Sequence, residues 1–224
     1  MITCDKCKQG TLFVVYNQIG IQSYQCNKCD NKKNKYELDI QEQEKQKALA
    51  QTKDLNDKIT QLKANFDTLI YGYPEIKSLI LDIVDTHIKD LTDKPTHLLL
   101  VGASGTSKTY FFEILQNTFN DASKICFIDC SHLSGSGLVS FLNETQSFKT
   151  LSFVILDELD KLDKNNQKKL LIALECGILS EKKYKRNISL DVSNILFFAT
   201  ANEKEKIYEP LLNRFTTLEI PPQT

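Results

Sequence analysis

Two short segments of this chain carry residues whose types and spacing could do chemistry together: a loop of small residues that ends in Lys-Thr, and two adjacent carboxylates. The loop, residues 102–109, follows an apolar run at 97–101 that is typical of a buried parallel strand, and it precedes a helical pattern. Unpaired backbone N–H groups converge where a strand turns tightly into a helix, so the segment predicts an anion site. Its residues are Gly102, Ala103, Ser104, Gly105, Thr106, Ser107, Lys108 and Thr109.

The last residues of this phosphate loop are the ones that would act on a nucleotide. We expect Lys108 to reach the β- and γ-phosphates and the Thr109 hydroxyl to ligate Mg²⁺. Ser107 stands where the usual motif has glycine, and we interpret the loop as a variant because serine still supplies a backbone N–H and a small side chain. A glycine- and serine-rich turn without a ligand is the alternative for this segment taken alone.

Asp157 and Glu158 follow a second apolar run, residues 152–156, and stand at its carboxyl end. Open α/β sheets bind ligands beyond the carboxyl ends of their strands, so both carboxylates would face the phosphate loop. Asp157 is the candidate that holds the Mg²⁺ shell, and Glu158 is the candidate general base for the attacking water. The alternative is an exposed acidic loop, since Asp160 and Asp163 follow closely.

Two further segments complete an ordered set: Phe-Phe-Ala-Thr-Ala-Asn at 197–202 and Leu-Leu-Asn-Arg-Phe at 211–215. With all four elements in this order, the chain from about residue 67 onward resembles the AAA+ ATPases. The resemblance is in particular to the subgroup of archaeal MoxR-like proteins and bacterial Holliday-junction branch-migration motors. It implies a core that hydrolyses ATP with Mg²⁺ and assembles into a homo-oligomeric ring, a hexamer.

The resemblance also implies roles for residues that the chain alone leaves open. Asn202 would contact the γ-phosphate or the lytic water, and Arg214 would enter the nucleotide site of a neighbouring subunit. Ile70 and Tyr71 would flank the adenine. Considered by themselves, Asn202 could cap a turn at the end of a strand and Arg214 could form a surface salt bridge.

Residues 178–191 have two strand-like halves around a basic tip, which predicts a hairpin. The resemblance implies that such a hairpin faces the channel of a ring, where its charges could hold a nucleic-acid backbone. A solvated basic turn is equally compatible with the sequence. The basic residues are Lys182, Lys183, Lys185 and Arg186. The loop at 131–137 lacks the aromatic residue that protein-unfolding rings usually carry there, which disfavours a protein-threading machine.

Cys4, Cys7, Cys26 and Cys29 form a C-x₂-C-x₁₈-C-x₂-C pattern, which is typical of a structural zinc site. Four thiolates would complete a closed tetrahedron around Zn²⁺ and leave no position for water. Strand-like runs around a turn lie between the two pairs and resemble a zinc ribbon, in which metal binding supplies much of the stability. Whether the ribbon binds DNA, RNA or protein, or serves only in folding, stays open.

An α/β fold would position these groups. We predict a P-loop NTPase of the AAA+ type, with a parallel five-stranded sheet flanked by helices. A zinc ribbon at 1–38 and an amphipathic helical linker at 39–66 precede this core, which spans 67–224. The linker has one apolar stripe, better suited to docking on its own domain than to a coiled coil. The stripe consists of Leu55, Ile59, Leu62 and Phe66.

Composition narrows the class of protein further. The chain has 224 residues, 41% of them hydrophobic, and a net charge of −1, which is ordinary for one α/β domain with a small module. No apolar stretch approaches the ~18 residues that span a membrane. Cysteine thiols and a thiolate metal site favour a reducing cytoplasm. In the resembling family a helical lid with a second sensor follows this region, and the given sequence ends at Thr224. We therefore expect the lid to be absent and turnover to be reduced, the alternatives being a fragment of a longer chain or a lid supplied from elsewhere.

These observations together predict MgATP hydrolysis coupled to the remodelling of a partner. DNA is the favoured partner, as in a branch-migration or helicase-like motor, because of the basic hairpin, the ribbon and the subgroup resemblance. One alternative is a MoxR-like chaperone that remodels protein complexes. The other is a lidless ATP-gated binding module with little turnover.

Overall fold

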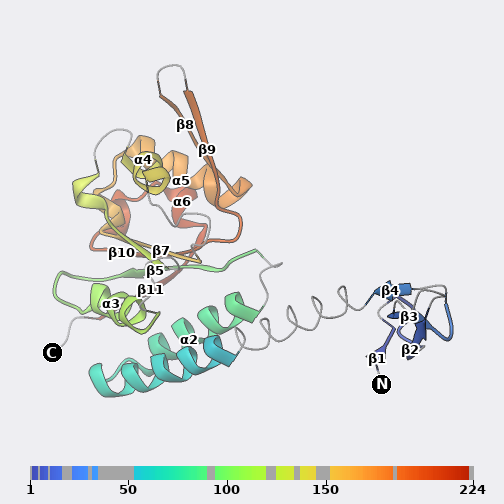
Figure 1. Cartoon of the computed structure of the whole chain (residues 1–224). Helices are drawn as coiled ribbons and strands as arrows, with labels where there is room; N and C mark the ends of the chain where they lie inside the picture. Colours follow the sequence, from blue (N-terminus) through green and yellow to red (C-terminus); the bar gives the residue numbers. More distant parts are fainter. Residues whose placement is uncertain are drawn as a thin grey trace. The chain divides into compact units, whose positions relative to one another are not determined.

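The computed structural model describes residues 2–4, 6–9, 11–16, 22–29, 32–34, 53–89, 94–119, 125–133, 137–144, 152–183 and 186–221 (Figure 1). The chain divides into two compact units, Met1–Asn56 and Asp57–Thr224. No helix in the described part of the chain is long and apolar enough to cross a membrane.

The first unit contains a four-stranded antiparallel sheet with the order β1-β2-β3-β4. The strands are β1 (Ile2–Thr3), β2 (Thr11–Tyr16), β3 (Gln22–Cys26) and β4 (Lys32–Asn34). Among its described side chains, the buried cluster consists of Cys4, Leu12 and Cys26. Because a module of this size buries little apolar surface, small domains of this kind usually rely on a further source of stability such as a metal.

The second unit contains a five-stranded parallel sheet with the order β11-β5-β10-β7-β6. The strands are β5 (His97–Val101), β6 (Ile125–Asp129), β7 (Phe153–Asp157), β10 (Leu196–Ala201) and β11 (Phe215–Glu219). Every residue of β5 and β10 is buried, which explains why both strands are nearly continuous apolar runs. The predicted α/β fold with five parallel strands is therefore confirmed.

Helices cover both faces of this sheet (Figure 1). They are α2 (Pro74–Lys89), α3 (Lys108–Phe119), α4 (Gly137–Glu144), α5 (Lys164–Cys176) and α6 (Glu209–Leu212). Three 3₁₀ turns, η1 (Cys130–His132), η3 (Leu159–Lys161) and η4 (Lys204–Lys206), follow β6, β7 and β10. Figure 1 shows α4, α5 and α6 on one face and α2 and α3 on the other.

The ends of α5 follow ordinary capping rules. The Asp163 carboxylate accepts the backbone N–H groups of Asn165 and Asn166 at the first turn. Gly177 ends the helix with φ 72°, and a Cβ at this position would lie 2.8 Å from the Cβ of Ser193. Glycine is therefore required there both for its backbone conformation and for space.

A helix described over residues 53–69 docks on α3. Lys58 Nζ donates to the Phe119 carbonyl at 3.1 Å, and Asn65 Nδ2 donates to Thr118 Oγ1 at 2.9 Å. The Phe66 side chain is fully buried, and its ring packs edge-on against Phe111 with centroids 5.8 Å apart. The division between the two units therefore falls inside this helix, at Asn56, and its later residues belong to the second unit.

The predicted hairpin is present as β8 (Ile178–Lys183) paired antiparallel with β9 (Arg186–Asp191), directly before β10. Its base is anchored in the protein, because Leu179 and Leu190 are buried. Lys169 of α5 forms an ion pair with Glu181 at 2.6 Å. Lys185 lies outside the described residues, and so do the side chains of the other three basic residues predicted at the tip.

His97 is a buried imidazole at the start of β5. Its Nδ1 accepts the backbone N–H of Phe197 at 3.1 Å, and its ring packs against those of Phe197 and Phe215. Burial lowers the pKa of His97 from 6.5 to about 4, and charge on Lys94 and His87 acts in the same direction.

This burial makes the stability of the second unit depend on pH. Between pH 6.5 and about 4 the unfolded chain binds a proton at His97 and the native chain does not, so stability falls as pH falls through this window. We expect a loss of about 3 kcal/mol across the full shift, measured by urea unfolding at several pH values. His97→Asn, which keeps an acceptor for the Phe197 N–H but does not titrate, should show a shallower dependence. Equal slopes for both proteins would contradict this assignment.

Candidate active site

The phosphate loop, residues 102–109, connects the carboxyl end of β5 to α3. Gly102 donates its N–H to the Ala201 carbonyl at 3.1 Å, and a Cβ on Gly102 would lie 2.7 Å from the Ile220 carbonyl oxygen. Glycine is thus needed where two neighbouring strands approach the loop. The Lys108 side chain is buried, and its ammonium donates to the carbonyls of Gly102 and Ala103 at 2.8 Å each. Burial lowers the pKa of Lys108, and nearby carboxylates, Asp157 foremost, oppose this effect.

Ser107 has φ 62°, in the left-handed region that favours glycine. This is the position where the sequence departs from the common motif. Gly105, with φ 83°, adopts the left-handed conformation without a side chain. The loop therefore contains two left-handed residues and carries local strain at Ser107, the one of the two that has a side chain.

Ser107→Gly is expected to stabilise the protein by about 0.5–1 kcal/mol, because the left-handed strain on an L-residue is larger than the extra unfolded-state entropy of glycine. Ser104→Gly is the matched control: Ser104 lies in the same loop without a positive φ, so only the entropic cost remains and stability should fall slightly. Urea unfolding of both variants measures the difference. A stability loss for Ser107→Gly equal to that of the control would show that the strain is absent.

The two predicted carboxylates lie beside the phosphate loop. Asp157 is the last residue of β7, and the Thr109 hydroxyl donates to its Oδ1 at 2.8 Å. Glu158 follows with φ 55°, a left-handed conformation that turns the chain sharply after the strand. The contact brings a hydroxyl and a carboxylate oxygen together, and hard oxygen ligands of this kind suit Mg²⁺.

Asn202, one residue past the end of β10, contacts the acidic residues that follow β7. Its Nδ2 donates to Glu158 Oε1 at 3.4 Å, and its backbone N–H donates to Asp160 Oδ1 at 3.1 Å. The structure therefore brings three of the four predicted elements together: the phosphate loop, the acidic pair Asp157 and Glu158, and the segment that ends in Asn202. Beside them lies a cleft of about 490 Å³. It is lined by Val101, Gly102, Asn202, Lys204, Glu205, Glu219, Ile220 and Pro221.

Sequence reasoning missed two residues of this site, Thr200 and Asp160. Thr200 Oγ1 donates to Asp157 Oδ1 at 2.6 Å and accepts the Glu158 N–H at 2.9 Å. Asp160 is buried and holds the backbone of Asn202. A signal for Thr200 was present, because it is a polar residue in an apolar strand, two positions before Asn202 and hence on the same face.

Arg214 lies at the opposite edge of the sheet. It directly precedes Phe215, which pairs with His97 at the start of β5, whereas the phosphate loop follows the end of that strand. The length of β5 separates the two edges, about 13 Å at the usual rise per strand residue. The Arg214 guanidinium forms an exposed ion pair with Glu175 of α5.

The segment predicted to flank the adenine follows the helix at 53–69. Ile70 is buried, and its carbonyl accepts Lys77 Nζ at 2.6 Å, whereas Tyr71 is 98% exposed. The Tyr73 ring packs against Phe111 of α3 with centroids 6.0 Å apart. The segment therefore lies against the helix that begins at Lys108, and the contact of Ile70 and Tyr71 with adenine stays a prediction.

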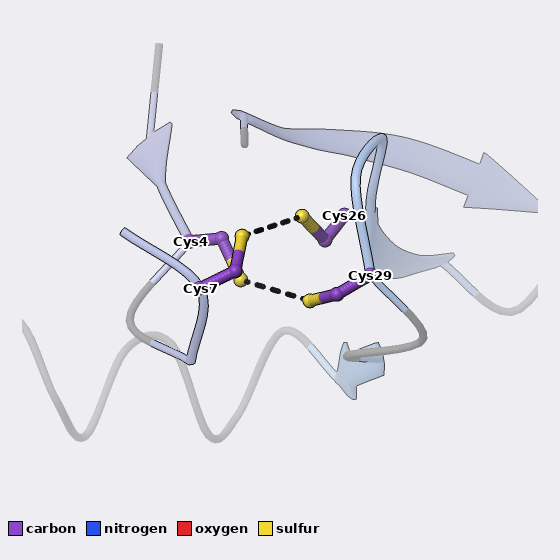
Figure 2. Close-up of side chains that lie close together, drawn as sticks. All are labelled: Cys4, Cys7, Cys26 and Cys29. Atoms are coloured by element: carbon purple, nitrogen blue, oxygen red, sulfur yellow. Dashed lines mark hydrogen bonds between the residues drawn. The ribbon is translucent and has the colours of Figure 1, made fainter. Parts of the chain in front are cut away.

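The four cysteines of the first unit converge, with Cys4 and Cys7 facing Cys26 and Cys29 (Figure 2). All four sulfur atoms lie within 4.8 Å of one another, and the Cys4–Cys29 and Cys7–Cys26 pairs are 3.6 Å apart. A disulfide would need about 2.05 Å, whereas a zinc tetrahedron with Zn–S bonds of about 2.3 Å has edges of about 3.8 Å. The Lys28 N–H donates to the Cys26 sulfur at 3.3 Å. The spacing fits a four-thiolate metal site.

Comparison with known proteins places the second unit among ATPases. Residues 98–222 match the family model described as "ATPase family associated with various cellular activities (AAA)". The matched range contains the phosphate loop, both carboxylates, Asn202 and Arg214.

Similar curated proteins include Lon proteases. The mitochondrial Lon protease homolog of Schizosaccharomyces pombe is 28% identical over 169 residues, covering 67% of this chain and 16% of that protein. Lon protease 1 of Borreliella burgdorferi is 29% identical over 177 residues, covering 70% of this chain and 22% of that protein. The chain thus spans about a fifth of the length of these relatives. Neither the family model nor these relatives are named for the MoxR-like or branch-migration subgroup, so that finer placement stays a prediction.

A solved structure supports the fold. The structure titled "Closed State CryoEM Reconstruction of Hsp104:ATPyS and FITC casein" aligns with a TM-score of 0.60 and 19% identity. The alignment covers 74% of this chain and 36% of that one. At this identity the likeness concerns the fold alone.

Proposed function

The chain belongs to the AAA family of ATPases, and from this premise we propose that it hydrolyses MgATP to remodel a protein partner. The observation that supports this most directly is the contact between Thr109 of the phosphate loop and Asp157, with Glu158 and Asn202 beside them. In the proposal, these neighbouring residues at one edge of the sheet act as a phosphate-binding loop, a metal-binding pair, a base and a polar sensor.

Each residue of the site has a role in the proposed reaction. The loop N–H groups and Lys108 bind the β- and γ-phosphates, and Thr109 with Asp157 holds Mg²⁺. The bound ion supplies positive charge that neutralises the phosphates. Glu158 accepts a proton from water as the water oxygen bonds to the γ-phosphorus and the bond to ADP breaks. Asn202 orients Glu158 and the γ-phosphate.

We also propose that Arg214 acts on a neighbouring subunit in a ring. Its position at the far edge of the sheet from its own phosphate loop supports action in trans. An arginine delivered in this way stabilises the charge of phosphoryl transfer. The pair with Glu175 would then describe a subunit whose arginine has not reached a neighbour.

The names of the relatives support a protein as the partner. Those proteins are called proteases, and the aligned structure contains casein, which is a protein. DNA, favoured by the sequence, is the second candidate because four basic residues lie at or beside the tip of the β8–β9 hairpin. The loop at 131–137 also has no aromatic residue, which disfavours the threading of a protein chain. The experiment below distinguishes a protein partner from DNA.

For the first unit we propose a structural zinc ribbon at residues 1–38, followed by the linker at 39–66. The sulfur distances and the four-stranded sheet around them support this assignment. Four thiolates leave no open coordination position, so the metal would stabilise the fold and take no part in catalysis.

The test is ATP hydrolysis by the full chain over a protein-concentration series, alone, with casein and with DNA. We expect the rate per subunit to rise with protein concentration and with casein, and to vanish in Glu158→Gln while MgATP still binds. Glu113→Gln, the same change at an exposed position on α3, is the control. Stimulation by DNA but not casein, abolished by Lys182→Glu and Lys183→Glu, would favour the DNA motor. MgATP binding without turnover at any concentration would favour an ATP-gated binding module.

A further inference from the structure

The Thr200 hydroxyl holds both residues of the acidic pair at once. Thr200 lies on β10, between β5 and β7, and is 1% exposed. Its Oγ1 donates a hydrogen bond to Asp157 Oδ1 at 2.6 Å and accepts one from the Glu158 backbone N–H at 2.9 Å. The same hydroxyl thus donates a hydrogen bond to the carboxylate of Asp157 and accepts one from the backbone of Glu158.

These bonds occur where the β7–β10 ladder ends. The backbone register runs from Leu196 opposite Phe153 to Ala199 opposite Leu156. At the next position, the Thr200 side chain connects the two strands, because it forms hydrogen bonds with Asp157 and Glu158. The Glu158 backbone has φ 55°, a conformation that costs about 1–3 kcal/mol and persists only where surrounding contacts hold it. The bond from its N–H to Thr200 is such a contact.

Packing alone does not require threonine at this position. Valine has nearly the same shape, and β-branched apolar residues suit a buried central strand. A buried hydroxyl is costly unless it is hydrogen-bonded, so the group that distinguishes threonine from valine here is used entirely on Asp157 and Glu158. Its contribution is therefore the placement of those two residues.

The hydrogen bonds of Thr200 help to position Asp157 and Glu158, and through Glu158 the contact with Asn202. Asp157 Oδ1 accepts hydrogen bonds from the hydroxyls of both Thr200 and Thr109, so its carboxylate is held between β10 and the phosphate loop. The Glu158 backbone is tied to β10, and its carboxylate meets Asn202, which follows that strand. One hydroxyl thus fixes the position of both acidic residues relative to β10.

We propose that Thr200 is a positioning residue for ATP hydrolysis, whose hydroxyl aligns Asp157 for Mg²⁺ and Glu158 for the attacking water. The proposal rests on the proposed ATPase function. Thr200 touches the groups that hold the metal and the water, so it acts through them. Its loss should weaken Mg²⁺ binding and slow turnover, and should leave the affinity of the phosphate loop for nucleotide nearly unchanged.

The experiment compares Thr200→Val, Thr200→Ser and a matched control, Thr118→Val. Thr118 is also a buried threonine, and its hydroxyl donates to the Ile114 carbonyl and accepts from Asn65, away from the acidic pair. For each full-length protein, the Mg²⁺ concentration for half-maximal activation, kcat, and the affinity for ATP in EDTA are measured. Thermal unfolding of each variant reports the purely structural cost of losing a hydroxyl.

For Thr200→Val we expect a roughly 10–100-fold lower kcat and a similar rise in the Mg²⁺ requirement, as is usual when a group that orients a metal ligand is lost. Affinity for ATP in EDTA should change less than about threefold, and Thr200→Ser should recover most of the activity because it restores the hydroxyl. Thr118→Val should lose stability without a changed Mg²⁺ requirement. If the wild-type protein shows MgATP turnover and Thr200→Val has the same kcat and Mg²⁺ requirement, the proposal is wrong and the ATPase function stands. A wild-type chain that binds no MgATP would overturn both.

Discussion

Replacing Arg214 with alanine is expected to lower kcat for ATP hydrolysis by about 10³-fold or more, with little change in the affinity for MgATP. The reason is geometric. Arg214 precedes β11 at the edge of the sheet away from the phosphate loop, about one strand length from it at roughly 3.3 Å per residue, so its charge is available to another subunit and not to its own. Steady-state kinetics at protein concentrations that support assembly, with calorimetric MgATP titration, separates turnover from binding.

Two controls distinguish this role from the ion pair seen in the structure. Glu175→Gln removes the partner of Arg214 and keeps the arginine, so its kcat should stay within a fewfold of the wild-type value, since exposed pairs contribute about 0–1 kcal/mol. Arg214→Lys keeps the charge without the planar fork and should recover only part of the rate.

A mixing experiment tests action in trans directly. Arg214→Ala subunits retain Glu158, and Glu158→Gln subunits retain Arg214, so a mixed assembly contains sites with both groups although each variant alone is inactive. Recovery of hydrolysis on mixing is the expected result. Failure to recover, with assembly confirmed by light scattering, would mean that Arg214 serves its own subunit or only the fold.

If the first unit holds zinc as proposed, removal of that metal should unfold this unit while the second unit stays folded. The described part of this unit buries only Cys4, Leu12 and Cys26, whereas structural Zn²⁺ sites bind with about 10–16 kcal/mol at neutral pH. Amide spectra of the full chain should lose the dispersed signals of β1 to β4 after chelation, and should regain them when Zn²⁺ is added. Metal analysis should give one zinc per chain.

The cysteine variants make this test specific. Cys7→Ser leaves three thiolates and should abolish stoichiometric zinc, whereas Cys176→Ser, an exposed cysteine on α5, should leave the zinc content unchanged. An unchanged amide spectrum after complete removal of metal would show that the sheet folds without it.

Much of the site followed from local sequence because its elements are short and their chemistry is local. An apolar run that ends in Asp157 and Glu158 predicts a buried strand with carboxylates at its carboxyl end, and the structure has β7 there. Ser107 in place of glycine predicts a variant of the loop, and the structure has a left-handed backbone at this residue. The roles in catalysis remain predictions.

Other features were beyond sequence reasoning because they depend on pairs of residues far apart in the chain. Thr200 and Asp157 are hydrogen-bonded across neighbouring strands, and neither segment of sequence indicates that the other is its partner. The same holds for Asp160 with Asn202, and for the docking of Asn65 on Thr118. A polar residue in an apolar run indicates that Thr200 is unusual, but only the placement of β10 between β5 and β7 shows that its hydroxyl contacts the acidic pair.

By itself, the sequence predicted the two buried strands that end at the phosphate loop and at the acidic pair, the hairpin before β10, and four cysteines with the spacing of a metal site. These follow from hydrophobic period, small residues and fixed intervals, all of which act over a few neighbouring residues. Only the tertiary structure decided that β10 lies between β5 and β7, and therefore that Thr200 and Asn202 meet the acidic pair. It also placed Arg214 at the far edge of the sheet. Strand order arises from non-local pairing, in which side chains from distant parts of the chain must be buried together.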